Sequence, residues 1–260
     1  MEKENLDTKL LKKLRKLAEK GKYKKYLKVI NKALGKVKVE DCGEKMLFLP
    51  DCLRNDIFIK LVDLKISIKD EERLFLREGI VERLNKAQDL LPRGYHLLIR
   101  DVFRSEDVVW KIYKIYLEEF KEREPGLSDK EVDLKVRNFV AMPDDPVPPG
   151  HMTGGAIDIV LADDKKEKMN LNVDESIISR EEQLFTFHPK LPKDILEKRK
   201  ILYDAMTGVG FRNYFREYWH YSYGDPYWAV YRKEKTAIYG VPSRELFGKI
   251  PNLPADRHGS

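Results

Sequence analysis

Cysteine is scarce in this sequence. Among 260 residues only Cys42 and Cys52 are cysteines. Two isolated thiols do not make the disulfide framework of a small secreted domain, and a reducing cytoplasm is the simplest compartment for such a chain. Without a second pair they also make a poor zinc site. We therefore expect a cytoplasmic protein whose fold depends on an apolar core.

Long apolar runs are missing as well. No stretch approaches the ~20 apolar residues that a membrane-spanning helix needs, and residues 1–30 lack the apolar centre of a secretory signal. Hydrophobic residues make up 42% of the chain and charged residues 36%, a balance typical of soluble globular proteins. The length suits one large domain, with or without an added arm.

Positive charge is concentrated near the N-terminus. Residues 1–38 contain fourteen Lys or Arg and four Asp or Glu, so this segment has a formal charge of +10 and the remainder has −4. Leucines recur in it at helical spacing, at Leu6, Leu10, Leu14 and Leu17. This pattern predicts an amphipathic helix. We accordingly divide the chain into a basic helical arm, residues 1–38, and a domain, residues 39–260.

The basic arm has two interpretations. In the first, it packs against the domain and leaves its charged face in solvent. In the second, it is a basic amphipathic helix that makes weak contact with an anionic membrane surface or with nucleic acid. The domain lacks the aromatic and basic stacking pattern of nucleic-acid binders, so we expect no nucleic-acid partner. Under the second interpretation, removal of the arm should leave the function of the domain intact.

Helix and strand patterns are interleaved without regular alternation in the rest of the chain. They predict helices at residues 70–91, 105–123 and 194–210, and strands at residues 46–50, 95–103, 156–162 and 211–225. Residues 163–193 are polar and irregular. This arrangement favours an α+β fold, with a small, mostly antiparallel sheet flanked by helices and an N-terminal helical extension.

Two short blocks contain the residues with the clearest chemistry. The first, GHMTGGAIDIVL, starts at Gly150 and contains His151 and Asp158 on either side of two glycines that let the backbone turn tightly. The second, EYWH, runs from Glu217 to His220. Catalytic zinc takes three protein ligands from His, Asp, Glu or Cys and keeps one position open. Both histidines and Asp158 would complete this set, with Glu217 on the same element as His220 and free to accept a proton.

The two blocks resemble the zinc peptidases of the D-alanyl-D-alanine dipeptidase and carboxypeptidase family. That family is marked by S-x-H-x-x-G-x-A-x-D and later by E-x-W-H, which here read PGHMTGGAID at residues 149–158 and EYWH at residues 217–220. Residues 98–109, LIRDVFRSEDVV, and residues 199–231 are similar to the dipeptidase branch. The resemblance covers roughly residues 45–240 and implies a metallopeptidase that carries one Zn²⁺ per chain on its small sheet.

The resemblance implies a role for each matching residue. Zinc would be held by His151, Asp158 and His220, and Glu217 would act as the general base. Arg104 matches the family arginine that stabilises the developing oxyanion, a task that suits a guanidinium because its charge and its donor fork are fixed.

Two further positions bear on substrate choice. Asp174 falls where the dipeptidase branch has an acid that holds the free ammonium group of the substrate, although the residues before it, NLNV, differ from the family pattern. Pro149 stands where the family has a serine. Proline offers no hydroxyl, so the substitution affects specificity rather than metal chemistry. Asp101 and Trp219 would lie beside the site.

These residues predict a zinc-dependent dipeptidase that hydrolyses D-Ala-D-Ala or a similar small dipeptide in cell-wall peptidoglycan metabolism. One alternative is a carboxypeptidase that acts on longer cell-wall peptides, and the two differ in whether residues 163–193 close the site or leave a groove. Another alternative is a non-catalytic, zinc-stabilised binding module. Glu217 and Arg104 argue against the module, because a structural zinc needs neither.

Overall fold

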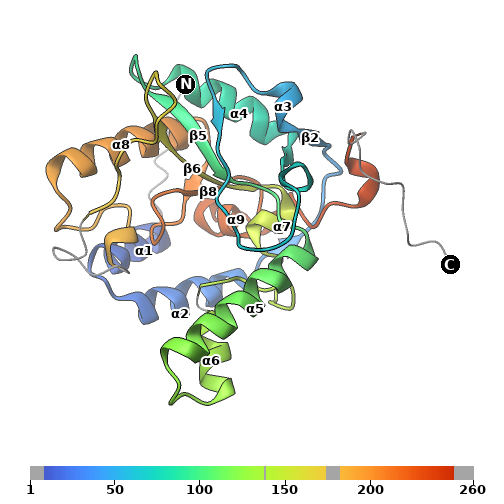
Figure 1. The fold of residues 1–260 in the computed structure, drawn as a ribbon, viewed down its shortest axis with the longest axis vertical. Helices are drawn as coiled ribbons and strands as arrows, with labels where there is room; N and C mark the ends of the chain where they lie inside the picture. Colours follow the sequence, from blue (N-terminus) through green and yellow to red (C-terminus); the bar gives the residue numbers. More distant parts are fainter. Residues whose placement is uncertain (1–8, 138, 174–181, 249–260) are drawn as a thin grey trace.

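A mixed five-stranded sheet forms the centre of the molecule (Figure 1). The structure is a computed structural model that describes residues 9–137, 139–173 and 182–248. The strand order is β3-β5-β6-β8-β7; β3 runs parallel to β5, and the other neighbours are antiparallel. Its strands are β3 (Phe58–Ile59), β5 (His96–Asp101), β6 (Ala156–Ala162), β7 (Arg212–Asn213) and β8 (His220–Ser222). The described residues also form two strand pairs, β1 (Lys38–Val39) with β9 (Thr236–Ala237) and β2 (Met46–Phe48) with β4 (Phe75–Arg77).

Helices surround this sheet. Those described are α1 (Lys9–Glu19), α2 (Tyr23–Leu34), α3 (Leu49–Cys52), α4 (Glu78–Asp89), α5 (Glu106–Arg123), α6 (Asp129–Val136), α7 (Gly150–Thr153), α8 (Lys193–Gly208) and α9 (Pro226–Arg232). The α5–α6 pair projects away from the sheet (Figure 1). No helix in the described ranges is long and apolar enough to cross a membrane. The α+β class, the mostly antiparallel sheet and the N-terminal helices agree with the sequence-based prediction.

The alternation of side chains along β6 determines where the core and the site lie. Ile157 and Ile159 are fully buried in the main hydrophobic cluster, together with Leu84 of α4 and Leu202 of α8. Successive side chains of a strand point to opposite faces, so Asp158 lies on the face opposite Ile157 and Ile159. On that face Val160 and Ala162 are also buried in the cluster. Asp158 and His220 are polar residues paired at the other end of β6.

Some predicted elements differ from the observed ones. The helix expected at residues 70–91 begins only at Glu78, because Phe75–Arg77 pair with Met46–Phe48 as a strand. The strand expected at residues 211–225 is interrupted after Asn213 by turns and resumes at His220. Tertiary pairing overrides local periodicity in both cases.

The N-terminal helices pack onto the domain. Leu14 of α1 and Tyr26 and Ile30 of α2 are fully buried in a second hydrophobic cluster, which also contains Phe215 and Val230. The apolar face of α1 is formed by Leu11, Leu14, Leu17 and Ala18. Leu10 is only partly buried, and Leu6 lies outside the described residues. Since this face is already covered by protein, α1 and α2 fit the packed-arm interpretation.

Candidate active site

His151 lies on a single helical turn, α7, which delivers the chain to β6. The turn ends at Gly154, whose φ of 69° lies in the left-handed region that glycine adopts without strain. The next residue, Gly155, passes so close to Tyr223 that a Cβ atom would lie 2.6 Å from its carbonyl oxygen. The paired glycines therefore allow both the turn after α7 and the close packing of this turn against the backbone just after β8.

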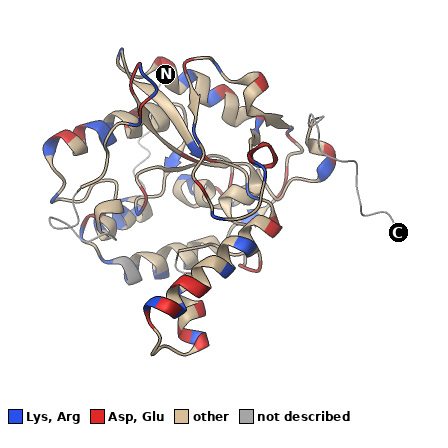
Figure 2. Cartoon of the chain, viewed as in Figure 1, with Lys and Arg blue, Asp and Glu red and all other residues tan. Residues whose placement is uncertain are grey.

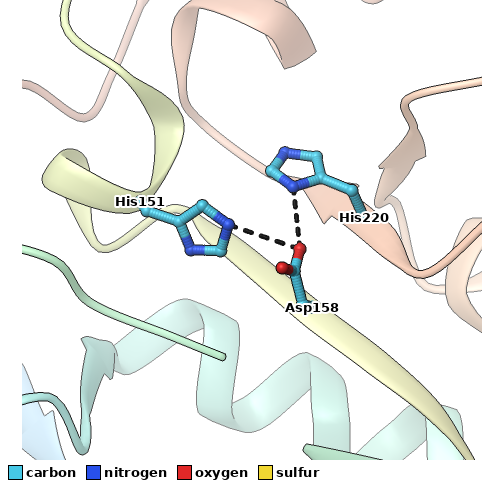
Figure 3. Close-up of side chains that lie close together, drawn as sticks. All are labelled: His151, Asp158 and His220. Atoms are coloured by element: carbon cyan, nitrogen blue, oxygen red, sulfur yellow. Dashed lines mark hydrogen bonds and ion pairs between the residues drawn. The ribbon is translucent and has the colours of Figure 1, made fainter. Parts of the chain in front are cut away.

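Asp158 and His220 are neighbours across two strands. The antiparallel register of β6 and β8 pairs them directly, and His220 Nδ1 lies 2.9 Å from Asp158 Oδ1. His151 reaches the same oxygen atom from α7, with Nε2 at 3.3 Å. Figure 3 shows the carboxylate between the two imidazole rings. The structure thus brings together two blocks that lie about sixty residues apart in the sequence, as predicted.

The charges of Asp158 and His220 shift each other's pKa values. Burial opposes ionisation of Asp158, but the charges and hydrogen bonds of His151 and His220 outweigh it and hold the pKa of Asp158 well below its usual value. Burial likewise opposes protonation of His220, yet its hydrogen bond to Asp158 prevails and raises the pKa of that imidazole. The carboxylate therefore requires positive charge beside it.

The cluster fits a bound divalent cation. One potential ligand atom from each of the three residues lies within 4.8 Å of the others, and two imidazoles with one carboxylate form a donor set that zinc accepts. His151 Nδ1 donates a hydrogen bond to the Val102 carbonyl oxygen, at 2.6 Å. In the neutral imidazole this bond leaves the lone pair on Nε2, which faces Asp158, and such bonds orient metal-binding histidines. A cation would replace the protons that neutralise Asp158.

Arg104 lies beside this cluster and is held by Asp101. Its Nε and Nη2 atoms donate to Asp101 Oδ2 at 2.8 and 2.5 Å. Asp101 is fully buried and also accepts from Arg73 Nη2 at 2.7 Å. Nη1 of Arg104 makes no hydrogen bond with any described residue, so one edge of the guanidinium is available to a ligand.

Glu217 precedes β8 and is not part of it, in contrast to the expectation that it shares an element with His220. It lies in the turn after β7, where its N–H donates to the Tyr214 carbonyl oxygen and its own carbonyl oxygen accepts from His220 N–H at 3.1 Å. Burial raises the pKa of its carboxyl group, an effect that the nearby His220 opposes. A carboxylate with a raised pKa is a better proton acceptor.

A cleft of about 880 Å³ contains these side chains. It is lined by His151, Asp158 and His220 together with Arg104, Glu217 and Trp219. Asp174, the remaining predicted site residue, lies outside the described residues. Of the described part of residues 163–193, none lines the cleft.

The outer walls of the cleft come from elements that the sequence did not associate with the site. They include Leu27, Asn31 and Leu34 of α2, and Ile112 and Tyr116 of α5. Tyr214, whose ring lies 6.0 Å from that of His220, is also part of the wall. No local sequence pattern could have identified the α2 residues, because more than one hundred positions separate them from His151.

Comparison with known proteins agrees with this geometry. Residues 58–236 match the family model described as D-Ala-D-Ala dipeptidase. The chain belongs to this family of metallopeptidases. The matched region contains the His151–Asp158–His220 cluster, Arg104 and Glu217, and α1 and α2 lie outside it. The D-alanyl-D-alanine dipeptidase of Synechocystis sp. is 26% identical over 219 residues, which cover 74% of this chain and 87% of that protein.

Two solved structures also resemble this metallopeptidase. One is a variant of VanY, a vancomycin-resistance D,D-pentapeptidase from a VanB-type cassette, in complex with Zn(II). It is 19% identical, with a TM-score of 0.34, and the match covers 73% of this chain and 88% of that chain. The other is VanYB in complex with D-alanine-D-alanine, 17% identical, with a TM-score of 0.36 and coverage of 76% and 92%. At such TM-scores neither structure adds weight to the family assignment, which depends on the sequence match.

Proposed function

We propose that this protein is a zinc-dependent dipeptidase that hydrolyses D-Ala-D-Ala or a similar small dipeptide. The observation that carries the proposal is the convergence of the His151–Asp158–His220 cluster, Arg104 and Glu217 on one cleft. The name of the Synechocystis relative supports the substrate class. We further assign the activity to peptidoglycan metabolism in the cytoplasm.

His151, Asp158 and His220 would hold one zinc ion. When bound there, zinc supplies a Lewis acid that polarises the scissile carbonyl group and lowers the pKa of water. Glu217 accepts a proton from the attacking water and delivers it to the leaving amine, a task that its raised pKa suits. Arg104, which Asp101 fixes through two hydrogen bonds, directs its remaining edge at the oxygen that becomes negative.

Asp174 completes the proposal at the other end of the substrate. It would hold the free ammonium group, which restricts hydrolysis to dipeptides. Asp174→Asn should then raise KM for D-Ala-D-Ala and leave the zinc content unchanged.

A second candidate is a carboxypeptidase that removes the last residue of a longer peptide. It is favoured by the size of the cleft, about 880 Å³, and by its extension to α2 and α5. A dipeptide would occupy only the part next to His151, whereas the outer part has room for further residues.

One assay separates the two candidates. The purified, zinc-loaded protein is offered D-Ala-D-Ala, L-Ala-L-Ala and a pentapeptide that ends in D-Ala-D-Ala, and release of free alanine is followed. Preference for the D,D-dipeptide supports the dipeptidase, and preference for the pentapeptide supports the carboxypeptidase. A protein that binds zinc and hydrolyses none of them would be a binding module.

The metal assignment has its own test. His151→Ala removes one of the three donors, so zinc content and hydrolysis should be lost together. A variant that retains full zinc content would remove His151 from the set of ligands.

A further inference from the structure

A second concave surface lies on the N-terminal helices, outside the cleft described above. It is a groove of about 660 Å³ between α1, α2 and the segment that joins α9 to β9. Its floor is aliphatic and consists of Leu10, Val29, Ala33, Val37 and Val230. Its rim contains seven lysines, namely Lys13, Lys25, Lys28, Lys32, Lys36, Lys233 and Lys235. We call this surface the lysine groove.

The described residues do not neutralise the charge of the lysine groove. All seven lysines are exposed, and none forms an ion pair with a residue in the described ranges. Among the described residues of the lining there is one acid, Glu234, and its carboxylate lies 4.0 Å from Arg232. The lysines around the groove repel one another. An anion that enters the groove is attracted by several lysines at once and relieves this repulsion.

The position of the lysines on α2 separates this surface from the active site. Lys25, Lys28 and Lys32 recur at helical spacing along one face of α2, and Lys36 follows shortly after the end of the helix. Another face of the same helix contributes Leu27, Asn31 and Leu34 to the cleft. A third face buries Tyr26 and Ile30 in the protein. The lysine groove is thus adjacent to the active-site cleft and shares no side chain with it.

We propose that the lysine groove docks the protein on an anionic phospholipid surface. Lysine is a compact, mobile point charge, and clusters of lysines bind anionic headgroups through summed electrostatic attraction. The aliphatic floor offers an apolar contact to the lipid below the headgroup. The helices do not insert their own apolar faces, because Leu14, Tyr26 and Ile30 are already buried in the protein.

Phospholipid fits this surface better than nucleic acid does. Proteins that bind single strands stack bases on aromatic side chains, and no aromatic residue is among the described residues that line the lysine groove. Arginine, which recognises phosphates and bases through a fixed fork, is also missing from that described lining. Lysines around aliphatic side chains suit a phospholipid instead, which has a charged headgroup next to an apolar chain.

The test measures binding and does not depend on the proposed peptidase activity. The zinc-loaded full chain is sedimented with phosphatidylcholine vesicles that contain or lack phosphatidylglycerol, at low and high salt. We expect binding only to the vesicles with phosphatidylglycerol, and release at high salt, because surface charges are screened there. Lys28→Gln, Lys32→Gln and Lys233→Gln combined should weaken this binding by at least about tenfold.

A matched variant controls for net charge. Lys69→Gln, Lys86→Gln and Lys111→Gln remove the same charge from exposed positions outside the groove, and this variant should bind vesicles as well as the unaltered protein does. An equal loss in both variants would overturn the proposal, since net charge alone would then explain binding. Equal binding to vesicles without phosphatidylglycerol would also overturn it, as would a higher affinity for duplex DNA at the same salt concentration.

Discussion

At the scale of single residues, the candidate site is a set of charges that hold one another in place. Asp158 accepts from two imidazoles, and Asp101 fixes Arg104. The Val102 carbonyl oxygen fixes the orientation of His151. His151, Asp158 and Arg104 are thus oriented by protein neighbours before a substrate binds, which is the arrangement expected of a catalytic site. The roles of Glu217 and Arg104 can be separated by substitution.

Glu217→Gln should retain zinc and lose turnover. Glutamine keeps the shape of the side chain but cannot accept a proton, so we expect turnover to fall by about 10²–10⁴-fold, the range typical of a lost acid–base group. Zinc content and kcat are measured on the same preparation. Full zinc with unchanged turnover would refute the general-base role, and loss of zinc would make Glu217 a ligand.

Arg104→Lys should behave as a severe substitution. Lysine cannot donate two bonds to Asp101 and still present a fixed edge to the substrate. Loss of one oxyanion donor typically costs about 3 kcal/mol of barrier, so kcat should fall by about two orders of magnitude while zinc content stays constant. Should kcat remain near the value of the unaltered enzyme, Arg104 would have a structural role only.

At the scale of elements, α2 connects the surface, the core and the site. The Tyr26 hydroxyl lies 2.6 Å from the Tyr231 hydroxyl of α9, and the ring of Tyr26 packs edge-on against Tyr214, 5.6 Å away. Tyr214 in turn contacts the His220 ring. The helix therefore supports one predicted zinc ligand from behind, although it lies outside the family match.

Deletion of residues 1–38 should consequently destabilise the protein and abolish hydrolysis. Removal of the segment would expose Phe215, Val230 and Tyr231, which are buried against it, and would open one wall of the cleft. This outcome is the opposite of the one expected for a free arm. Solubility, melting temperature and D-Ala-D-Ala hydrolysis are compared with those of the full chain. A soluble truncated protein with normal activity would show that the segment is dispensable.

A milder substitution tests the same helix without removing it. Tyr26→Phe keeps the ring contacts and leaves the Tyr231 hydroxyl buried without its partner, which should lower the free energy of unfolding by about 1–3 kcal/mol. Denaturant unfolding of the two proteins gives the difference. No change would mean that the hydrogen bond contributes nothing to the packing of α2.

Local sequence patterns predicted the helices and strands that are marked by their own residues, such as a continuous apolar run or a capping residue. β6 was predicted with its observed limits, and α5 within one residue, because an apolar run and a capping position mark their ends. The first third of the helix expected at residues 70–91 was wrong, because pairing with β2 cannot be seen in local periodicity. α9 was not predicted, although Asp225 as the N-cap and Pro226 at the first turn were visible signals.

The candidate site was easier to predict than the fold around it. His151, Asp158 and His220 lie in two short blocks that are weak signals separately and that together match the motifs of the family, and the structure brings them together. The contribution of α2 to the cleft depends on packing between segments far apart in sequence, which composition and periodicity do not report.

At the scale of the whole molecule, charge is distributed unevenly. The positive charge of the chain is concentrated in residues 1–38, whereas Figure 2 shows acidic and basic positions interspersed on the α5–α6 pair. We retain the division into a basic segment, residues 1–38, and a peptidase domain, residues 39–260, as a proposal. In it the two parts have different functions, but they do not fold independently. The segment shares a hydrophobic cluster with the domain, and its exposed lysines form the groove discussed above.

The stability of the whole molecule should depend on zinc more strongly as pH rises. Without metal, the Asp158 carboxylate lies beside the His220 imidazole, at hydrogen-bond distance. Burial acts to lower the pKa of His220, but its bond to Asp158 outweighs burial, so the pKa of this imidazole is raised in the fold. Protonation of a group with a raised pKa stabilises the fold fully when the pH is below the pKa of that group in the unfolded chain, about 6.5 for histidine. This contribution is lost as the pH rises through the pKa of the group in the folded state. Zinc replaces these protons and binds the deprotonated ligands, so its stabilising effect should increase over the same pH range.

Melting temperatures of the protein with zinc and with chelator test this expectation. Measured between about pH 6 and pH 9, they should diverge toward high pH. The melting temperature of His151→Ala should respond much less to chelation. A constant difference across this range would mean that the proton-sharing cluster is not where the metal binds.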